Sequence, residues 1–145
     1  MFELGTDGPK SILVAVDGSE TSLRAAAYAA GLARRQGSDL IALFVHTPGA
    51  MAAMRPESVV GMSATNAETA RQLRQAIADN AERIGVRVSL IEREGDPAIE
   101  IAKAADELRV DAVVVGASTQ VGHRFIGALG IHLIKLAHWP VTVVP

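Results

Sequence analysis

The residues best suited to chemistry lie between Asp111 and Ala137. Here an apolar run, Ala112 to Val115, leads into Gly116, and two further glycines follow at Gly122 and Gly127. Glycines after a parallel strand let backbone N–H groups approach a ligand closely, and the dipole of the next helix favours negative charge at its N-terminus. The stretch is therefore a candidate phosphate-binding loop.

A second polar cluster, Asp17-Gly18-Ser19, follows the apolar run Ser11 to Val16. Ligands of open parallel sheets bind beyond the carboxyl ends of the strands, where the strand order reverses. If the order reverses between these two runs, Asp17 and Gly116 face one crevice, and Asp17 could accept hydrogen bonds from ribose hydroxyls or an adenine amine. The alternative is that Asp17 and Ser19 only cap the next helix. The two roles are compatible.

Alternating strands and helices must position these clusters. Short aliphatic runs predict strands, and Ala- and Leu-rich stretches with capping residues predict helices. The expected strands are 11–16, 40–45, 86–91, 112–115 and 141–144, and the expected helices are 20–36, 63–84, 97–108 and 126–137. Right-handed crossovers then give an α/β fold, a single doubly wound parallel sheet with helices on both faces. We expect a flexible leader at 1–9 and one domain at 10–145.

Helical spacing also predicts which side chains are buried. The expected buried faces are Leu23, Ala27, Ala30 and Ala33; Ala70, Leu73, Ile77, Ala81 and Ile84; Ala98, Ile101, Ala105 and Leu108; and Leu129, Leu133 and Leu136. The run 86–91 alternates apolar and polar residues, which predicts a half-exposed strand at the sheet edge.

Composition excludes several classes of function. The chain is 49% hydrophobic but 3% aromatic, which indicates an aliphatic core, and its net charge of -2 gives no basic surplus for nucleic acid or a membrane surface. With no cysteine, thiol catalysis and zinc–thiolate sites are excluded. The start, MFELGTDGPK, has no signal-peptide pattern, and no apolar run approaches the roughly 20 residues that span a bilayer. We expect a cytoplasmic protein.

The sequence contains no motif that indicates a catalytic site or a metal site. The chain has neither a G-x-S-x-G elbow nor a P-loop motif, and its histidines, at 46, 123, 132 and 138, lack zinc-ligand spacing. Residues 47–62 hold Pro48, Gly49, Pro56 and Gly61 together with methionines 51, 54 and 62. They predict an exposed connection, either a mobile loop or a lid over the strand ends.

Several segments together resemble the universal stress proteins of the UspA type. They are ILVAVDGSETS, EGDPAIEIAKAADE, DAVVVGAS and FIGALGIHLIKLAHWPVTVVP, and they span nearly the whole chain in this order. The resemblance implies the strand order 3-2-1-4-5, an adenine nucleotide as ligand, and a homodimer through the edge strand 141–144. An apolar edge strand with unpaired backbone groups also invites such pairing.

The ATP-binding branch of that family carries G-x2-G-x9-G-[ST] after the fourth strand. Gly116 matches its first glycine and Gly127 its last, whereas Thr119 and Ala128 replace the second glycine and the hydroxyl residue, and the loop is two residues shorter. Aligning Gly130 as the last glycine would leave the loop one residue too long. The nucleotide-binding residues that the resemblance implies are Ala15, Val16, Asp17, Val45, Gly116, Ser118, Thr119, Gly122, Gly127 and Ala128.

Three functions remain open from the sequence. The departures at Thr119 and Ala128 favour a dimeric regulatory domain in stress response whose nucleotide binding is weakened or lost. Asp17, Gly116 and Gly127 favour the alternative, an ATP-binding universal stress protein that uses the crevice between Asp17 and Gly116. An adenylate-forming or flavin-linked enzyme on a related scaffold would need a base or nucleophile that the pattern does not supply.

Overall fold

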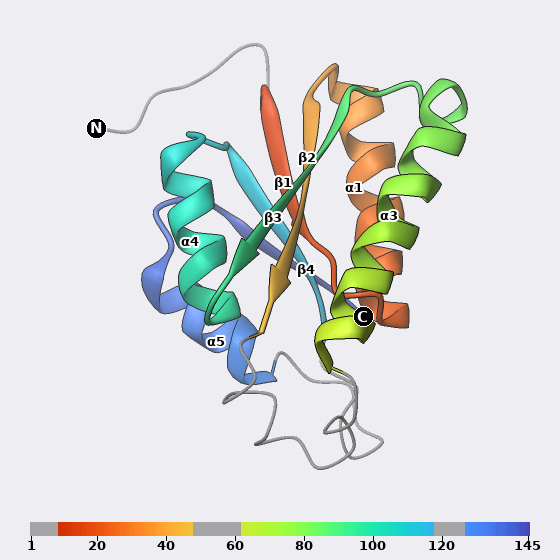
Figure 1. Cartoon of the computed structure of the whole chain (residues 1–145). Coiled ribbons are helices and arrows are strands. Elements are labelled where there is room, and N and C mark those ends of the chain that lie inside the picture. The colour runs from red at the N-terminus through yellow and green to blue at the C-terminus, as the bar shows by residue number, and fades with distance from the viewer. Residues whose placement is uncertain (1–8, 48–61, 118–126) are drawn as a thin grey trace.

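The computed structural model describes residues 9–47, 62–117 and 127–145. A central sheet separates two layers of helices: α1 and α3 cover one face, and α4 and α5 cover the other (Figure 1). The elements in chain order are β1 (Ser11–Ala15), α1 (Glu20–Gln36), β2 (Asp39–His46), α3 (Met62–Ile84), β3 (Val88–Glu94), α4 (Pro97–Glu107), β4 (Ala112–Gly116), α5 (Gly127–Leu136) and β5 (Val141–Val144).

The sheet is parallel, as the residue patterns predict, and it has the order β3-β2-β1-β4-β5 that the family resemblance implies. The chain moves outward from β1 to β3 and then returns to β4 on the other side of β1. The reversal of strand order therefore lies between β1 and β4, where the two candidate clusters were expected to meet.

Alternating side chains of β1 pack into two separate hydrophobic cores, one on each face of the sheet. Ile12 and Val14 are fully buried beneath α1 and α3, and Leu13 is fully buried on the opposite face. There Leu13 belongs to one cluster with Ile101 of α4 and Leu133 of α5. Because β1 is covered on both faces, it needs the continuous aliphatic sequence from which its position was predicted.

Capping residues mark both ends of α1 and the start of α4. Ser19 caps α1, because its Oγ accepts a hydrogen bond from the N–H of Ser22 at 3.3 Å, and Gly37 ends the helix with a φ of 67°. Asp96 caps α4 by accepting from the N–H of Ile99 at 3.1 Å, and Pro97 occupies the first helical turn.

The predicted buried face of α1 is wrong in part: Ala33 is buried as predicted and Ala30 is half-buried, but Leu23 and Ala27 are not buried. The residues buried against the sheet are Ser22, Ala25, Ala29 and Ala33, whereas Leu23 is 48% exposed and Ala27 is also exposed. Alanines at many positions of this helix leave several faces equally apolar, so that periodicity alone does not fix the rotation. The stripe containing Leu23 and Ala27 instead faces α3.

Smaller corrections concern single residues and one boundary. Leu108 and Leu136 are 39% and 36% exposed, because each lies at or beyond the last turn of its helix. Strand β3 runs from Val88 to Glu94, so it begins two residues later and ends three residues later than the predicted 86–91. It lies at the sheet edge, and half-buried and exposed residues alternate along it except at Leu90 and Ile91, which are both half-buried. The predicted burial of Ala81 falls outside the described side chains.

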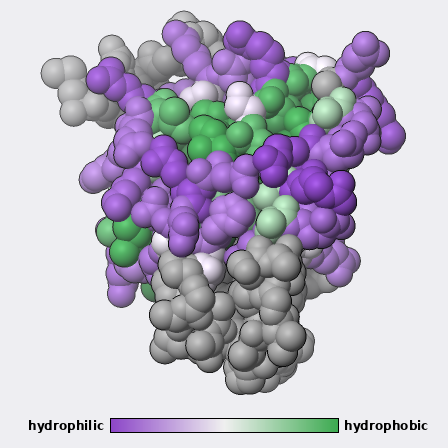
Figure 2. Space-filling view, viewed as in Figure 1, coloured by the Kyte–Doolittle hydropathy of each residue, from purple (hydrophilic) through white to green (hydrophobic). Residues whose placement is uncertain are grey.

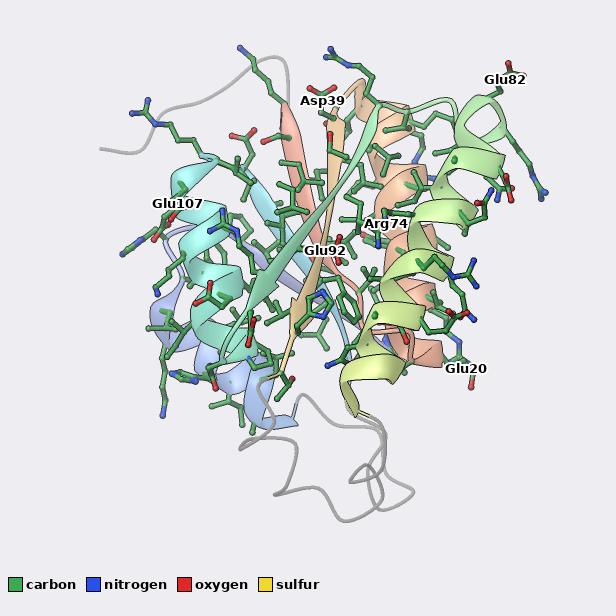
Figure 3. The ribbon with its side chains drawn as sticks, in the orientation of Figure 1. Glu20, Asp39, Arg74, Glu82, Glu92 and Glu107 are labelled. Atoms are coloured by element: carbon green, nitrogen blue, oxygen red, sulfur yellow. The ribbon has the colours of Figure 1, made fainter. Side chains whose placement is uncertain are left out.

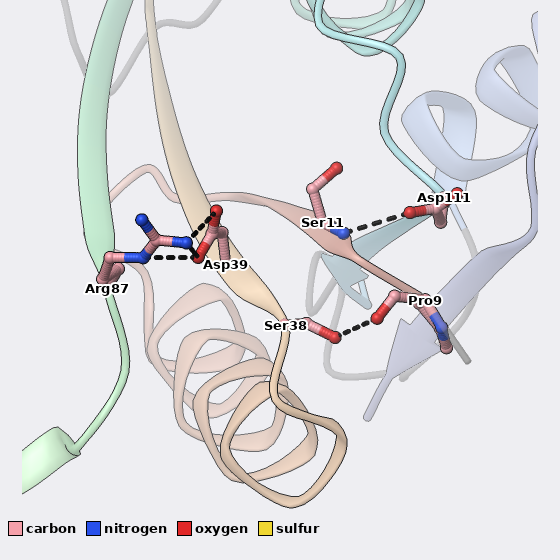
Figure 4. Close-up of polar contacts among 6 residues, drawn as sticks. All are labelled: Pro9, Ser11, Ser38, Asp39, Arg87 and Asp111. Atoms are coloured by element: carbon pink, nitrogen blue, oxygen red, sulfur yellow. Dashed lines mark hydrogen bonds and ion pairs between the residues drawn. The ribbon is translucent and has the colours of Figure 1, made fainter. Parts of the chain in front are cut away.

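Polar contacts fix the amino ends of three strands (Figure 4). Asp111 accepts hydrogen bonds from the backbone N–H groups of Lys10 and Ser11 at 2.8 and 3.0 Å, which joins the start of β1 to that of β4. Ser38 donates its hydroxyl to the carbonyl of Pro9. At the start of β2, the Asp39 carboxylate accepts hydrogen bonds from Nε and Nη2 of Arg87 at 2.9 and 3.0 Å.

Two predicted segments lie outside the described residues: the leader, apart from Pro9, and the connection 47–62, apart from its two ends. Across the residues that are described, no helix combines the length and the apolar character needed to cross a membrane.

Candidate functional site

The structure places Gly116 at the end of β4 and Asp17 just past the end of the neighbouring strand β1. Val14 pairs with Val114 in the parallel register of β1 and β4, and continuing that register by two residues sets Val16 beside Gly116. The tips of β1 and β4 therefore share the edge of the sheet at which the strand order reverses. The two clusters therefore occupy the neighbouring positions that the sequence predicts.

Asp17 takes part in the turn that begins α1, but it is not the cap. Its Oδ1 accepts a hydrogen bond from the N–H of Ser19 at 2.8 Å, and its own N–H donates to the Oγ of Ser22 at 3.2 Å. The side chain is exposed, and no described residue contacts Oδ2. One carboxylate oxygen thus organises the turn while the other remains available to solvent or a ligand.

Gly116 lies directly against the first turn of α1. A Cβ added to Gly116 would stand 2.6 Å from the carbonyl carbon of Thr21 and 2.7 Å from the N atom of Ser22. Backbone atoms cannot move aside as a flexible side chain can, so only glycine fits at this position. The glycine is therefore required by the packing of β4 on α1, whether or not a ligand is bound.

Gly127 has a separate backbone reason to be glycine. It is buried at the start of α5, and its φ of 77° lies in the left-handed region that other residues rarely adopt. Ala128 follows in the first turn and is exposed, with no hydroxyl to offer a ligand. Ser118, Thr119 and Gly122, the remaining predicted loop residues, lie outside the described residues.

The apolar site residues predicted at the strand ends point to opposite faces of the sheet. Val16 is 5% exposed and belongs to the core beneath α1 and α3. Ala15 and Val45 are half-buried and pack into the core on the α4 side. The three side chains therefore do not form one wall, and any ligand at the strand tips would meet their backbone rather than a shared apolar surface.

Three polar residues at this site were not predicted from the sequence. Thr21 and Ser22 are each 5% exposed and form the contact with Gly116. Thr69 of α3 lies next to Gly18, where an added Cβ would be 2.9 Å from its Cγ2. A search for apolar periodicity passes over small hydroxyl residues, although Thr and Ser at the first turn of a helix could have suggested the contact.

A charged contact joins β2, β3 and α3 near the carboxyl ends of the first two. His46 Nε2 lies 2.9 Å from Glu92 Oε1, and Arg74 Nη1 lies 3.2 Å from Oε2 of the same carboxylate. Arg74 and Glu92 face each other across the space between α3 and β3 (Figure 3). The His46 ring packs edge-on against Phe44, with centroids 4.7 Å apart. Among the described residues, no three His, Asp or Glu side chains are grouped as metal ligands.

Residues 9–145 match the model of the universal stress protein family. The chain belongs to the universal stress protein family. The universal stress protein MJ0531 of Methanocaldococcus jannaschii is 30% identical over 138 residues, which cover 93% of this chain and 81% of that protein. This membership supports a role in the stress response.

Solved structures of the family share the fold. UspA from Lactobacillus plantarum superposes with a TM-score of 0.78 at 26% identity, over 94% of this chain and 97% of that one. A universal stress protein solved in complex with cAMP gives a TM-score of 0.69 at 25% identity, over 94% and 96% of the two chains. The five-stranded sheet of the present chain and its order 3-2-1-4-5 are those of the UspA-like fold.

Proposed function

We propose that this universal stress protein is a dimeric regulatory domain in which adenine nucleotide binding is weakened or lost, and that it acts by binding partners rather than by catalysis. The observation that carries the proposal is the contact between Gly116 and the backbone of Thr21 and Ser22. Since packing alone requires glycine at position 116, its presence is no sign of a phosphate ligand.

The same reasoning applies to the other end of the loop. The φ of Gly127 accounts for the second retained glycine. The chain departs from the ATP-binding pattern at the two other positions, Thr119 and Ala128. Loss of the hydroxyl at 128 removes a hydrogen bond worth about 1 kcal/mol, and more to a charged group. The loop thus keeps the residues that folding needs and lacks those that a triphosphate needs.

The dimer proposal rests on strand β5. It lies at the sheet edge and, among the described strands, pairs with β4 alone, so no described strand pairs with the backbone groups of its other side. Its sequence, VTVV, carries no charge or proline that would discourage pairing with another chain. A second copy is the simplest partner, because equal edge strands can pair about a two-fold axis.

The alternative is an ATP-binding or other adenine-nucleotide-binding protein. Two observations support it: the exposed Oδ2 of Asp17, which no described residue contacts, and the related universal stress protein solved with cAMP. A carboxylate oxygen at this place suits ribose hydroxyls or an adenine amine. A nucleotide with fewer phosphates would depend less on the altered loop, so cAMP and AMP belong in the test beside ATP.

Calorimetry on the purified chain separates the two proposals. We expect neither heat nor a thermal shift with MgATP at millimolar concentration, and weak or absent binding of AMP and cAMP. Micromolar affinity for any of them, abolished by Asp17→Ala, would contradict the proposal and support the alternative. Mass spectrometry of the protein as purified shows whether a nucleotide accompanies it.

A gain-of-function variant tests the reason for weak binding. Thr119→Gly combined with Ala128→Ser restores the residue types of the ATP-binding pattern, and we expect it to raise ATP affinity. The control is Ala128→Gly, which removes Cβ without adding a hydroxyl. No gain in the double variant would identify the shorter loop, rather than these two side chains, as the obstacle.

A further inference from the structure

A cavity of about 470 Å³ lies between α1, α3 and the sheet, and Val16 is one of the residues that line it. Its floor is the aliphatic face of three strands, with Val14 from β1, Leu40 from β2 and Val88 from β3. The volume falls within the roughly 300–1,000 Å³ typical of small-molecule sites. In the space-filling view, apolar side chains gather over β3 and toward α3, with polar side chains around them (Figure 2).

The cavity exists because the facing residues of the two helices are small. Ala27, Ala30 and Gly31 line it from α1, and Ala76 lines it from α3. A Cβ added to Gly31 would meet no other atom within 4 Å, so the space beside it is open. This is the stripe of α1 that the sequence placed in the core. Its apolar residues face a space that no described side chain fills.

One end of the cavity is positively charged. Arg34, in the last turn of α1, and Arg83, in the last turn of α3, both line it. Arg34 reaches toward the end of α3, because its Cδ lies 3.7 Å from the position of a Cβ on Gly85. No carboxylate is among the described residues that line the cavity. Glu82, which neighbours Arg83, points away from the sheet (Figure 3).

These two arginines also differ from most others in the chain. Ion pairs to carboxylates occupy Arg24 (with Glu20), Arg71 (with Glu68), Arg74 (with Glu92), Arg87 (with Asp39) and Arg93 (with Glu107). Arg34 and Arg83 make no hydrogen bond or ion pair with any residue that the structure describes. Their guanidinium groups are therefore free to receive an anion, and paired carboxylate oxygens suit their geometry.

We propose that this cavity binds a free straight-chain fatty acid, its alkyl chain between α1 and α3 and its carboxylate at Arg34 and Arg83. The lining suits an amphiphile, because the floor and walls are apolar apart from Asn80, whose amide donates to the carbonyl of Ala76, while one end carries two arginines without a partner among the described residues. Leu23 and Arg34, which both line the cavity, are eleven positions apart on α1, so the cavity follows the helix over about 16 Å at the rise of 1.5 Å per residue. That length and the volume of the cavity suit one alkyl chain of medium length.

Binding of dodecanoate below its micelle concentration, measured by calorimetry, tests the proposal, with 1-dodecanol and butyrate as probes that lack the charge or the tail. We expect dodecanoate to bind about ten-fold or more tightly than either. The double variant Arg34→Ala/Arg83→Ala should remove the preference for the carboxylate over the alcohol. Arg35→Ala is the matched control, because Arg35 lies in the same turn but does not line the cavity. No binding of dodecanoate, or equal binding of acid and alcohol, would overturn the proposal.

Filling the cavity provides an independent test. Gly31→Leu should abolish binding of dodecanoate while it keeps or raises the melting temperature, because it replaces a mid-helix glycine and adds a side chain to open space. If that variant does not fold, Ala76→Leu closes the cavity from the opposite wall. Binding that survives the filled cavity would place the ligand elsewhere. Asp17→Ala should leave dodecanoate binding unchanged, which separates this site from the nucleotide crevice.

Discussion

Gly116, at the end of β4, is in contact with the backbone of Thr21 in the first turn of α1. A methyl group at Gly116 would lie 2.6 Å from the Thr21 carbonyl carbon and 2.7 Å from its oxygen. The contact joins the two strand tips between which the sheet reverses direction. It fixes how closely the end of β4 approaches the first turn of α1.

Gly116→Ala should destabilise the fold by about 1–3 kcal/mol, the cost of overpacking against atoms that cannot yield. Urea denaturation followed by circular dichroism measures the free energy of unfolding. The matched control is Gly31→Ala, because an added Cβ there meets nothing within 4 Å. That change should be neutral or stabilise by about 0.5–1 kcal/mol. Equal stability of Gly116→Ala and the wild type would show that the loop relaxes and that glycine is present for another reason.

The order and type of the elements could be predicted because each has a local cause. Apolar runs such as 112–115 predict buried strands, and Ser19, Gly37 and Asp96 mark helix ends at the places where the structure has them. The rotation of α1 could not be predicted, because its alanines offer several equivalent faces. Thr21 and Ser22 are buried, and their backbone atoms make the contact with Gly116, which no apolar pattern marks.

The position of the site could be predicted from the sequence, but the structural reason for its glycine could not. Parallel topology brings Asp17 and Gly116 to one edge, and that follows from the sequence of elements alone. The reason for Gly116 depends on a contact with Thr21, about a hundred residues away in the chain, which no local pattern records. The cavity could not be predicted for the same reason, since Arg34 and Arg83 line one space only when two helices pack on one sheet face.

Trp139 is held by Asp106, and breaking this contact should destabilise the fold. The indole Nε1–H donates to Oδ1 of Asp106 at 3.0 Å, and Trp139 is only 9% exposed. Asp106→Ala leaves this donor without a partner, which costs about 1–3 kcal/mol. Asp106→Asn keeps an acceptor and should lose less. Glu107→Ala, which removes the exposed partner of Arg93, should cost under about 1 kcal/mol. Equal losses at 106 and 107 would show that the indole contact contributes little.

Glu68 should titrate below the ordinary range for a glutamate. The Arg71 side chain donates hydrogen bonds to it at 2.6 and 3.0 Å and so lowers the Glu68 pKa, with a smaller contribution from the amide of Gln72. A carboxyl with a lowered folded-state pKa adds stability above its unfolded pKa and loses it as the pH falls through the folded value. Arg71→Ala should raise the Glu68 pKa, as measured by carbon NMR of the carboxyl group, whereas Arg74→Ala should not. An unchanged midpoint in Arg71→Ala would refute the assignment.

Val143→Pro should convert the proposed dimer into a folded monomer. The carbonyls of Pro140 and Val144 accept hydrogen bonds from β4, so the alternation of the strand directs the backbone of Val141 and Val143 outward, to the open edge. Proline at 143 removes one outward N–H and leaves the pairing with β4 in place. Light scattering during size-exclusion chromatography measures the mass, and circular dichroism checks that the variant is folded. Val143→Ala keeps the N–H and should remain dimeric. If Val143→Pro folds and stays dimeric, the two copies associate through a surface other than β5.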